Sequence, residues 1–433
     1  MGSNWRKTTI GEELQLQRGI DITKRDFRDG KIPVVSSSGI GGFHNTFTAV
    51  GPGVILGRKG VVGSVYYLST DYWAHDTTLW VKDFKGNHPK YVYYFFRSMS
   101  EVLKGLDVGS ANPTLNRNHV HPIETLWAPI EEQKAIAHIL GNLDEKIELN
   151  RQMNQTLEAM AQALFKSWFV DFDPVIDNAL AAGNDIPDEL KARAAARQAL
   201  GDQSKPLPPG IQRQFPDKFV LSDEMGWIPK GWNSIMLSDI ARLKTTSVIP
   251  NKEPETVWTH FSIPAFDNGQ HPTLDPGETI KSGKYRVPSH AVLASKLNPQ
   301  FPRVWMPDVQ DERYAICSTE FMPFEPNEPA ERPFLYSLFC SKTIQREIEN
   351  RVTGSTGSRQ RVKPKEIAEL PLLGVPAPLR QVFSKMARAW FERQSTNQQQ
   401  QKTLTELRDT LLPKLMSGEL RVPEAEKLVV EAV

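Results

Sequence analysis

Residues 136–168 decide the fold, and they read IAHILGNLDEKIELNRQMNQTLEAMAQALFKSW. Apolar or amide side chains recur there in alternating steps of four and three residues, at Ile136, Leu140, Leu143, Ile147, Asn150, Asn154, Leu157, Ala161, Leu164 and Trp168. This spacing is the seven-residue repeat of a coiled coil. Pro129 stands where a helix should begin. The pattern therefore predicts one long helix.

A similar pattern returns later in the chain. Its positions are Phe383, Met386, Trp390, Arg393, Asn397, Gln400, Leu404, Leu407 and Leu411. Pro378 stands at the expected start of this second helix, and Pro413 and Gly418 mark its expected end. The run Gln398–Gln401 leaves the length of the second helix less well defined than that of the first.

Both helical stripes are apolar at their ends and polar in the middle. Buried polar groups cost free energy unless they are paired, so the arrangement of lowest energy sets one polar middle against the other and fixes the register. We therefore expect the two helices to pair with each other within the chain. The alternative is two surface helices, each packed on its own domain. The stripes alone fit parallel and antiparallel pairing equally well.

The segments that precede the two helices are similar to each other. Five short matches occur in the same order and at similar spacing. They are Trp5–Ile10 with Trp232–Leu237, Val54–Lys59 with Val292–Leu297, Tyr91–Phe96 with Pro333–Phe339, Gly109-Ser110 with Gly354-Ser355, and Ala128–Glu131 with Ala377–Arg380. Matches in register favour an internal duplication. The alternative is a shared sheet architecture without shared ancestry.

Each half begins with short β-type runs that are separated by Gly, Pro, Ser and Asn. The runs of the first half are Ile32–Ser36, Gly53–Leu56, Ser64–Tyr67 and Thr77–Lys82. A helix is expected to follow at 89–103 in the first half and at 331–349 in the second. The fold class is therefore α/β (α+β), with two mixed α/β domains separated by two long helices. Between the halves, the sequence predicts a short helix from about Pro187 to Leu200.

Composition and charge limit the function. The chain has 433 residues, 39% hydrophobic and 24% charged, with a net charge of +1. A small surplus of Lys and Arg between residues 5 and 130 allows local contacts with phosphates. No apolar run reaches the roughly 18–20 residues of a membrane span, and no signal-peptide core is present, so we expect a cytoplasmic protein. Cys317 and Cys340 form neither metal-ligand spacing nor a disulfide framework, so no metal is expected.

Two motifs between the halves carry a family resemblance. The run Trp168–Pro174 (WFVDFDP), followed by Phe215-Pro216, Phe219-Val220 and Gly226–Trp232 (GWIPKGW), resembles the central conserved region in specificity subunits of type I restriction–modification systems. The order of segments along the chain is similar as well. The resemblance implies a first target recognition domain at 1–130, a spacer helix at 131–170, a linker at 171–226, a second recognition domain at 227–376, a second spacer helix at 377–420 and a tail at 421–433.

The resemblance also implies how such a chain works. Each recognition domain would read one half of a split site on double-stranded DNA. The helices would form an antiparallel pair that sets the spacing and docks two methyltransferase subunits, which in turn join restriction and motor subunits. S-adenosylmethionine would be held by the methyltransferase and not by this chain. The positions expected to pair the helices and dock subunits are Leu143, Ile147, Asn150, Asn154, Leu157, Leu164, Trp168, Phe383, Trp390, Asn397, Leu404 and Leu411.

Antiparallel pairing suits this function. A helix of about 35 residues is about 50 Å long, which exceeds one DNA turn of about 34–36 Å. Antiparallel helices would place the two recognition domains at opposite ends, whereas parallel helices would crowd them at one end.

Three flexible segments in each half offer hydrogen-bond donors and cations for bases and phosphates. In the first half the candidate DNA-binding residues are Ser36, Ser37, Ser38, Asn45, Arg58, Lys59, Asn112, Thr114 and Arg117. In the second half they are Lys296, Asn298, Arg303, Ser355, Thr356, Ser358, Arg359, Arg361 and Lys363. The run 353–363 is the most typical of DNA binding because its residues are small, basic or able to donate hydrogen bonds. The alternative for each segment is an ordinary solvated loop.

The sequence contains no recognisable catalytic motif. Asn112–Leu115 and Asn298–Phe301 come closest to the Asn-Pro-Pro-aromatic loop that holds a flipped adenine, but both lack the second proline. No phosphate loop is present. We therefore expect no catalytic residue and a non-enzymatic subunit. The alternatives are a fragment of a fused methyltransferase–nuclease and a coiled-coil scaffold without a DNA role.

Overall fold

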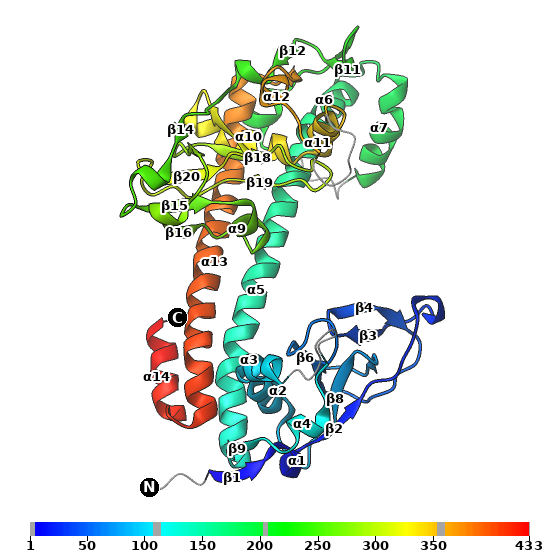
Figure 1. Cartoon of the computed structure of the whole chain (residues 1–433). Coiled ribbons are helices and arrows are strands. Elements are labelled where there is room, and N and C mark those ends of the chain that lie inside the picture. Colours follow the sequence, from blue (N-terminus) through cyan, green and yellow to red (C-terminus); the bar gives the residue numbers. More distant parts are fainter. Residues whose placement is uncertain (1–4, 107–113, 202–206, 353–359, 433) are drawn as a thin grey trace. The chain divides into compact units, whose positions relative to one another are not determined.

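The computed structural model describes residues 5–106, 114–201, 207–352 and 360–432. The chain divides into two compact units, which are Met1–Gln152 with Asn397–Val433 (unit 1) and Met153–Thr396 (unit 2). Two long helices, α5 (Ile130–Phe169) and α13 (Ala377–Ser417), contribute one part to each unit (Figure 1). Among the described residues, no helix is both long and apolar enough to cross a membrane.

Unit 1 contains a mixed α/β domain at the start of α5. Its elements are β1 (Arg6–Thr9), α1 (Ile10–Glu13), β2 (Gln15–Arg18), η1 (Lys24–Asp26), β3 (Ile32–Ser36), β4 (Gly39–His44), β5 (Gly53–Gly57), β6 (Val65–Leu68), β7 (Trp73–Ala74), β8 (Thr78–Asp83), α2 (Pro89–Ser98), α3 (Ser100–Gly105), α4 (Arg117–Val120), β9 (Glu124–Trp127) and α14 (Val422–Ala432). Helix α2 packs on strands β5 and β6 (Figure 1).

Unit 2 contains the second mixed α/β domain and the segment that joins it to α5. Its elements are α6 (Asp173–Ala182), α7 (Asp188–Leu200), α8 (Pro209–Gln212), β10 (Phe219–Ser222), β11 (Gly226–Pro229), β12 (Asn233–Met236), η3 (Leu237–Asp239), β13 (Ala241–Leu243), β14 (Ser247–Val248), η4 (Pro250–Lys252), β15 (Val257–Phe261), α9 (Ile263–Asp267), β16 (Thr273–Pro276), η5 (Gly277–Thr279), β17 (Lys284–Arg286), β18 (Val292–Ser295), β19 (Val304–Trp305), β20 (Ala315–Ser318), β21 (Phe321–Pro326), η6 (Pro329–Glu331), α10 (Arg332–Cys340), α11 (Lys342–Glu349), α12 (Pro364–Ala368) and β22 (Pro371–Gly374).

The sheet topology confirms the predicted duplication. The four-stranded sheet β2-β8-β5-β6 of unit 1 has the same strand order as β13-β21-β18-β19 of unit 2, and the pair β1-β9 corresponds to β12-β22. The remaining sheets differ in size, three strands (β4-β3-β7) against five (β14-β17-β20-β15-β16), although each contains one parallel pair. The strands expected in the first half are also confirmed. Each expected helix is divided in two, at Met99 in unit 1 and at Ser341 in unit 2.

The core of unit 1 joins the sheet to the long helices. Buried residues of β5 and β8 pack with α2, with the first turns of α5 and with the last turns of α13. Tyr91 and Phe95 of α2 meet the ring of Trp127 edge-on, with ring centroids 5.5 and 4.7 Å apart. Leu143, Leu404 and Leu411, three of the predicted pairing positions, are buried in this core. At about 25 cal/mol per Å² of buried apolar surface, such packing is the main stabilising contribution.

The core of unit 2 unites the motifs that carry the family resemblance. Trp168, Phe169 and Phe172 from the end of α5 and the turn after it pack with Phe215 and Trp232. Phe383 of α13 lies against Phe169 with ring centroids 5.6 Å apart. These aromatic residues are far apart in the sequence, so their shared core explains why the joining segment and both helices fold together.

The two long helices pair antiparallel in each unit. In unit 1, Asn150 of α5 donates to Gln400 of α13 at 3.3 Å, and Asp144 pairs with Arg408 at 2.7 Å. In unit 2, the side-chain amide of Asn154 donates to the carbonyl of Gln394 at 3.3 Å, while the Gln394 amide donates to the carbonyl of Asn154 at 2.8 Å. Residue numbers rise along one helix as they fall along the other, and polar residues meet polar residues as predicted.

The predicted pairing positions differ in burial. Those that are buried are Leu143, Asn150, Trp168, Phe383, Asn397, Leu404 and Leu411, and those that are half-buried are Ile147, Asn154, Leu157, Leu164 and Trp390. One position of the predicted stripe is wrong, because Arg393 is exposed and Gln394 faces α5 instead. A neutral amide at this position avoids the cost of burying a guanidinium.

Pro413 lies inside α13, which continues to Ser417 before Gly418 turns left-handed with φ of 71°.

A partly buried carboxylate lies next to this polar contact in unit 2. Glu158 accepts hydrogen bonds from Gln162 at 3.2 Å, from Tyr336 at 3.2 Å and from Gln394 at 3.4 Å. Burial raises the pKa of Glu158, and these hydrogen bonds only partly oppose the shift. Because the folded protein favours the protonated form, the contribution of Glu158 to stability is full below its usual pKa and is lost as pH rises through the raised value.

We therefore predict that Glu158→Gln becomes stabilising relative to the wild type as pH rises above the usual pKa of a glutamate, because only the wild type must then ionise a buried carboxyl group. Chemical denaturation at a series of pH values measures the difference in unfolding free energy. Glu349→Gln, at an exposed position of α11, controls for the loss of a surface charge. Parallel pH profiles for Glu158→Gln and the wild type would contradict this assignment.

Candidate nucleic-acid interface

In each unit two predicted DNA-binding segments come together at the end of a β-hairpin. In unit 1, Lys59 in the β5–β6 turn forms a bridge with Thr114, and the amide of Leu115 donates to the carbonyl of Arg58 at 2.9 Å. In unit 2, Leu297 in the β18–β19 turn forms the corresponding bridge with Arg361. The amide of Val362 donates there to the carbonyl of Lys296 at 3.1 Å. The two domains therefore build this corner in the same way.

The third segment of unit 1 joins the same corner through Ser37. The amide of Ser37 donates to the Thr77 hydroxyl at 3.2 Å, and its carbonyl accepts from Ser64 at 2.7 Å and from Tyr66 at 3.0 Å. Ser36 closes the β3–β4 turn by donating to the carbonyl of Gly39 at 3.0 Å. Ser37 is buried and fixed, and Ser38 beside it is exposed. Of the two, only Ser38 is free to reach a ligand.

Other predicted residues lie elsewhere. Asn45 is exposed at the end of β4 opposite the Ser36–Gly39 turn, so the strand separates it from that turn. Arg117 is exposed in the first turn of α4, which begins where the Asn116 side chain accepts from the Asn118 amide at 3.0 Å. Lys363 is exposed and pairs with Glu366 at 2.7 Å. Asn112, Ser355, Thr356, Ser358 and Arg359 lie outside the described residues.

A carboxylate stands beside the cations in each corner, and the sequence did not reveal it. In unit 2, Glu320 accepts from Nε of Arg361 at 3.0 Å and from its Nη2 at 2.8 Å. In unit 1, Asp76 accepts from Arg18 at 2.9 Å, and its backbone carbonyl accepts from Arg58 at 3.3 Å. Both acids lie in the turn that leads into β8 or β21. Their partners are distant in sequence, so only tertiary structure shows the pairing.

The pKa values of the arginines reflect these neighbours. The hydrogen bond with Glu320 raises the pKa of Arg361. Partial burial, together with the nearby charge of Arg18, lowers the pKa of Arg58. Arg303 of unit 2 forms a similar two-bond pair with Asp267, at 2.7 and 3.0 Å. Four of the cations in these corners are therefore held by protein oxygens, whereas Lys59 is exposed.

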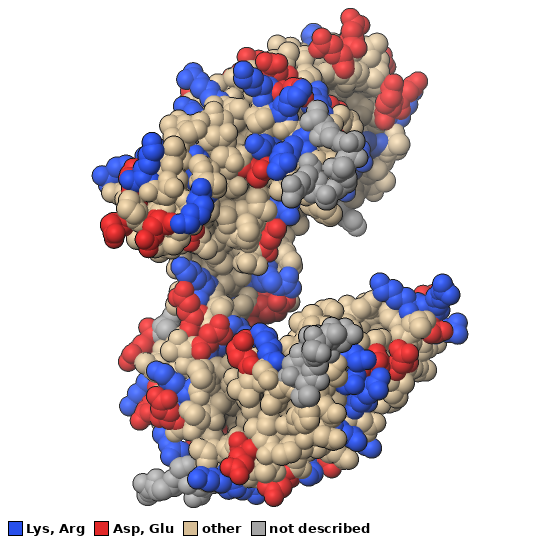
Figure 2. Space-filling view, viewed as in Figure 1, with Lys and Arg blue, Asp and Glu red and all other residues tan. Residues whose placement is uncertain are grey.

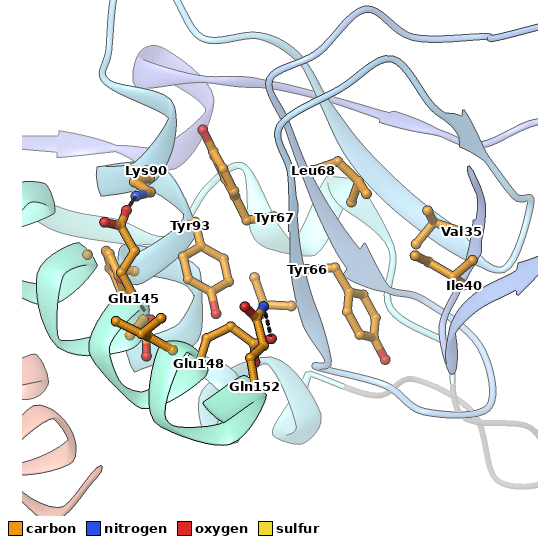
Figure 3. A pocket seen from close by; sticks show the side chains of 15 residues that line it. Val35, Ile40, Tyr66, Tyr67, Leu68, Lys90, Tyr93, Glu145, Glu148 and Gln152 are labelled. Atoms are coloured by element: carbon orange, nitrogen blue, oxygen red, sulfur yellow. Dashed lines mark hydrogen bonds and ion pairs between the residues drawn. The ribbon is translucent and has the colours of Figure 1, made fainter. Parts of the chain in front are cut away.

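Two surface features do not favour phosphates or metals. A cavity of about 720 Å³ in unit 1 lies between β6, α2 and α5, and Tyr66, Tyr93, Glu145 and Glu148 line it (Figure 3). Its carboxylates would repel DNA. Asp21, His75 and Asp76 bring possible metal-ligand atoms within 4.8 Å of one another, but Asp76 already pairs with Arg18.

Lysine and arginine side chains alternate with acidic ones over the face shown in Figure 2, which shows no extended basic patch. This mixture agrees with the net charge of +1. Affinity for DNA would therefore depend on a few local contacts rather than on the general field of the protein.

Comparisons with known proteins identify the class of this fold. Residues 2–159 match the family described as the type I restriction modification DNA specificity domain. The specificity subunit of the type I restriction enzyme MjaIX from Methanocaldococcus jannaschii is 28% identical over 348 residues, which are 77% of this chain and 70% of that protein. The HindI specificity subunit from Haemophilus influenzae is 27% identical over 318 residues, 67% of each chain.

A solved structure supports the fold. The S subunit of a type I restriction–modification system from M. genitalium aligns over 96% of both chains with a TM-score of 0.57, at 17% sequence identity. Residues 2–159 thus match the model of the type I specificity domain, and the fold of the chain is similar to that of a solved S subunit. The resemblance inferred from the central motifs is confirmed over most of the chain.

The two corners share one backbone requirement. Gly60 and Asn298 both follow the first two residues of their hairpin turns, and both are left-handed, with φ of 78° and 48°. Glycine and asparagine tolerate this conformation better than other residues.

We predict that Gly60→Asn folds with little loss of stability, whereas Gly60→Val costs about 1–2 kcal/mol because a branched side chain is strained at positive φ. Unfolding free energies of both variants measure the difference. Equal losses for Asn and Val would show that the turn changes conformation and that the two corners are not equivalent.

Proposed function

We propose that this chain is the DNA-reading subunit of a type I restriction–modification complex and recognises a bipartite site. The observation that carries the proposal is the duplicated corner. Two domains that share only short sequence matches place a hairpin turn, a bridging segment and basic side chains in the same arrangement. Donors on turns can reach base edges, and cations fix the register on phosphates.

The long helices support a split site. One continuous helix leaves each recognition domain, α5 after the first and α13 after the second, and the two are antiparallel. We infer that this pair sets the distance between two half-sites. The relatives named above are specificity subunits of type I restriction enzymes, which supports a shared role.

The partners follow from the same proposal. Two methyltransferase subunits would dock on the helices, and restriction and motor subunits would join through them. S-adenosylmethionine would be held by the methyltransferase, and this chain would supply recognition without catalysis. The outward faces of α5 and α13 offer exposed polar side chains for this docking.

A methylation and binding experiment tests the proposal. Methylome mapping of a host that carries the chain with its methyltransferase subunit should reveal a split adenine-methylated motif. When binding is measured on a duplex that contains this motif, Lys59→Ala should reduce the steepness of log affinity against log salt concentration by about 0.9. This is the value for one lost phosphate contact. Lys82→Ala is a matched control, because Lys82 is exposed near the far end of β8, which begins beside the corner.

The outcomes separate the possible functions. Absence of a methylated motif, or of DNA binding by the assembled complex, would refute the proposal and favour a scaffold. Methyl transfer by the purified chain alone would identify an enzyme. An unchanged slope for Lys59→Ala would show that the unit 1 corner does not contact phosphate.

A further inference from the structure

In each unit a tyrosine of the recognition domain donates a hydrogen bond to a carboxylate of α5. In unit 1, the hydroxyl of Tyr94 in α2 donates to Asp144 at 2.7 Å. In unit 2, the hydroxyl of Tyr336 in α10 donates to Glu158 at 3.2 Å. Burial raises the pKa of both hydroxyl groups, so each remains protonated and able to donate. The same pair of chemical groups therefore attaches each recognition domain to α5.

Each of these carboxylates also binds α13. Asp144 accepts from Arg408 at 2.7 Å, and Glu158 accepts from Gln394 at 3.4 Å. In each unit one acidic side chain therefore joins three helices, which are the two long helices and a helix of the recognition domain. A hydrogen bond to a charged group is stronger than one between neutral groups, so these contacts resist movement between the three helices.

The two contacts have the same place in the helix pattern. Asp144 and Glu158 each directly follow a pairing position of α5 and are two seven-residue repeats apart. Their partners on α13, Arg408 and Gln394, are separated by the same two repeats. Recurrence at equivalent positions of both helices indicates a shared role for the two contacts.

Helices α2 and α10 support the hairpins that form the corners. Helix α2 packs on β5 and β6, whose connecting turn contains Lys59. Helix α10 packs on β18 and β19, whose connecting turn contains Lys296. A tilt of either helix would therefore move the corner of its domain relative to the long helices. The hydrogen bonds of Tyr94 and Tyr336 oppose such a tilt.

We propose that Tyr94 and Tyr336, with the carboxylates that they bind, are positioning residues that hold each DNA-reading corner at a fixed place on the helix pair, so that the complex accepts one spacer length. This inference rests on the proposed DNA-reading function. An inserted base pair moves one half-site by about 3.4 Å along the duplex and turns it by about a tenth of a helical turn. A domain that is held on the helices cannot follow this movement, whereas a domain that tilts can.

The proposal separates two kinds of discrimination. Tyr94→Phe and Tyr336→Phe each remove one hydroxyl group and keep the ring, so the packing of α2 and α10 should persist. Each change should relax the preference for spacer length. The preference for the correct bases within each half-site should stay as in the wild type, because neither tyrosine takes part in the bridges that form the corners. A purely structural role would instead lower affinity for every duplex alike.

The experiment uses the full chain assembled with its methyltransferase subunit. Affinities are measured for a duplex with the methylated motif, for one whose spacer is longer by one base pair, and for one with an altered half-site. In each variant the preference for the native over the longer spacer should fall about tenfold, the factor that corresponds to the loss of one hydrogen bond to a charged group. In the double variant the two effects should multiply, because the contacts share no partner.

Tyr93→Phe provides the matched control. Tyr93 also lies in α2, but its hydroxyl accepts from Arg97 of the same helix at 3.1 Å. Its replacement should leave the preference for spacer length and the preference for the correct half-site unchanged. Thermal unfolding of each variant verifies the fold.

The outcomes distinguish the two proposals. A wild-type complex that does not prefer its own motif over the altered half-site refutes the DNA-reading function and this inference with it. A wild-type complex that reads its half-sites but accepts the longer spacer overturns the inference alone. The inference is likewise overturned if both variants keep the spacer preference of the wild type, or if they lose affinity equally for all three duplexes.

Discussion

The contact between the polar middles of two long helices is the constraint on which the rest of the structure depends. Asn150 meets Gln400, and Asn154 exchanges hydrogen bonds with Gln394. An apolar seam would tolerate a shift of one repeat, but a buried amide does so only if it finds another partner. Each helix contributes to the cores of both units, so the register that these amides select also aligns the residues that complete each core.

Duplication imposes the second constraint. The hairpin, the bridge and the left-handed residue recur in both domains, whereas the side chains at the turn differ, Arg58 and Lys59 in one and Lys296 and Leu297 in the other. A framework fixed by backbone hydrogen bonds lets the exposed residues vary without loss of the fold. This division suits a pair of domains that present different surfaces to different ligands.

Sequence reasoning predicted what depends on local pattern and could not predict what depends on distant contacts. Periodicity revealed both helices and their polar middles, and matches in register revealed the repeated sheet. The acids were missed because Asp76 meets Arg18, and Glu320 meets Arg361, across 58 and 41 residues. The choice of Gln394 over Arg393 depended on the cost of burying charge, which a strict repeat ignores. The sequence grouped Asn45 with the Ser36–Gly39 turn because it does not show which end of β4 lies at the corner.

Unfolding free energies of Asn150→Leu, Gln400→Leu and the double variant test the helix pairing most directly. Each single change leaves a polar partner unsatisfied and should cost about 1–3 kcal/mol. The double variant should cost less than the sum of the two single losses by about 1 kcal/mol or more. Two leucines that face each other leave no polar group unpaired between the helices. Strictly additive losses would show that these two side chains do not depend on each other, and would contradict the account.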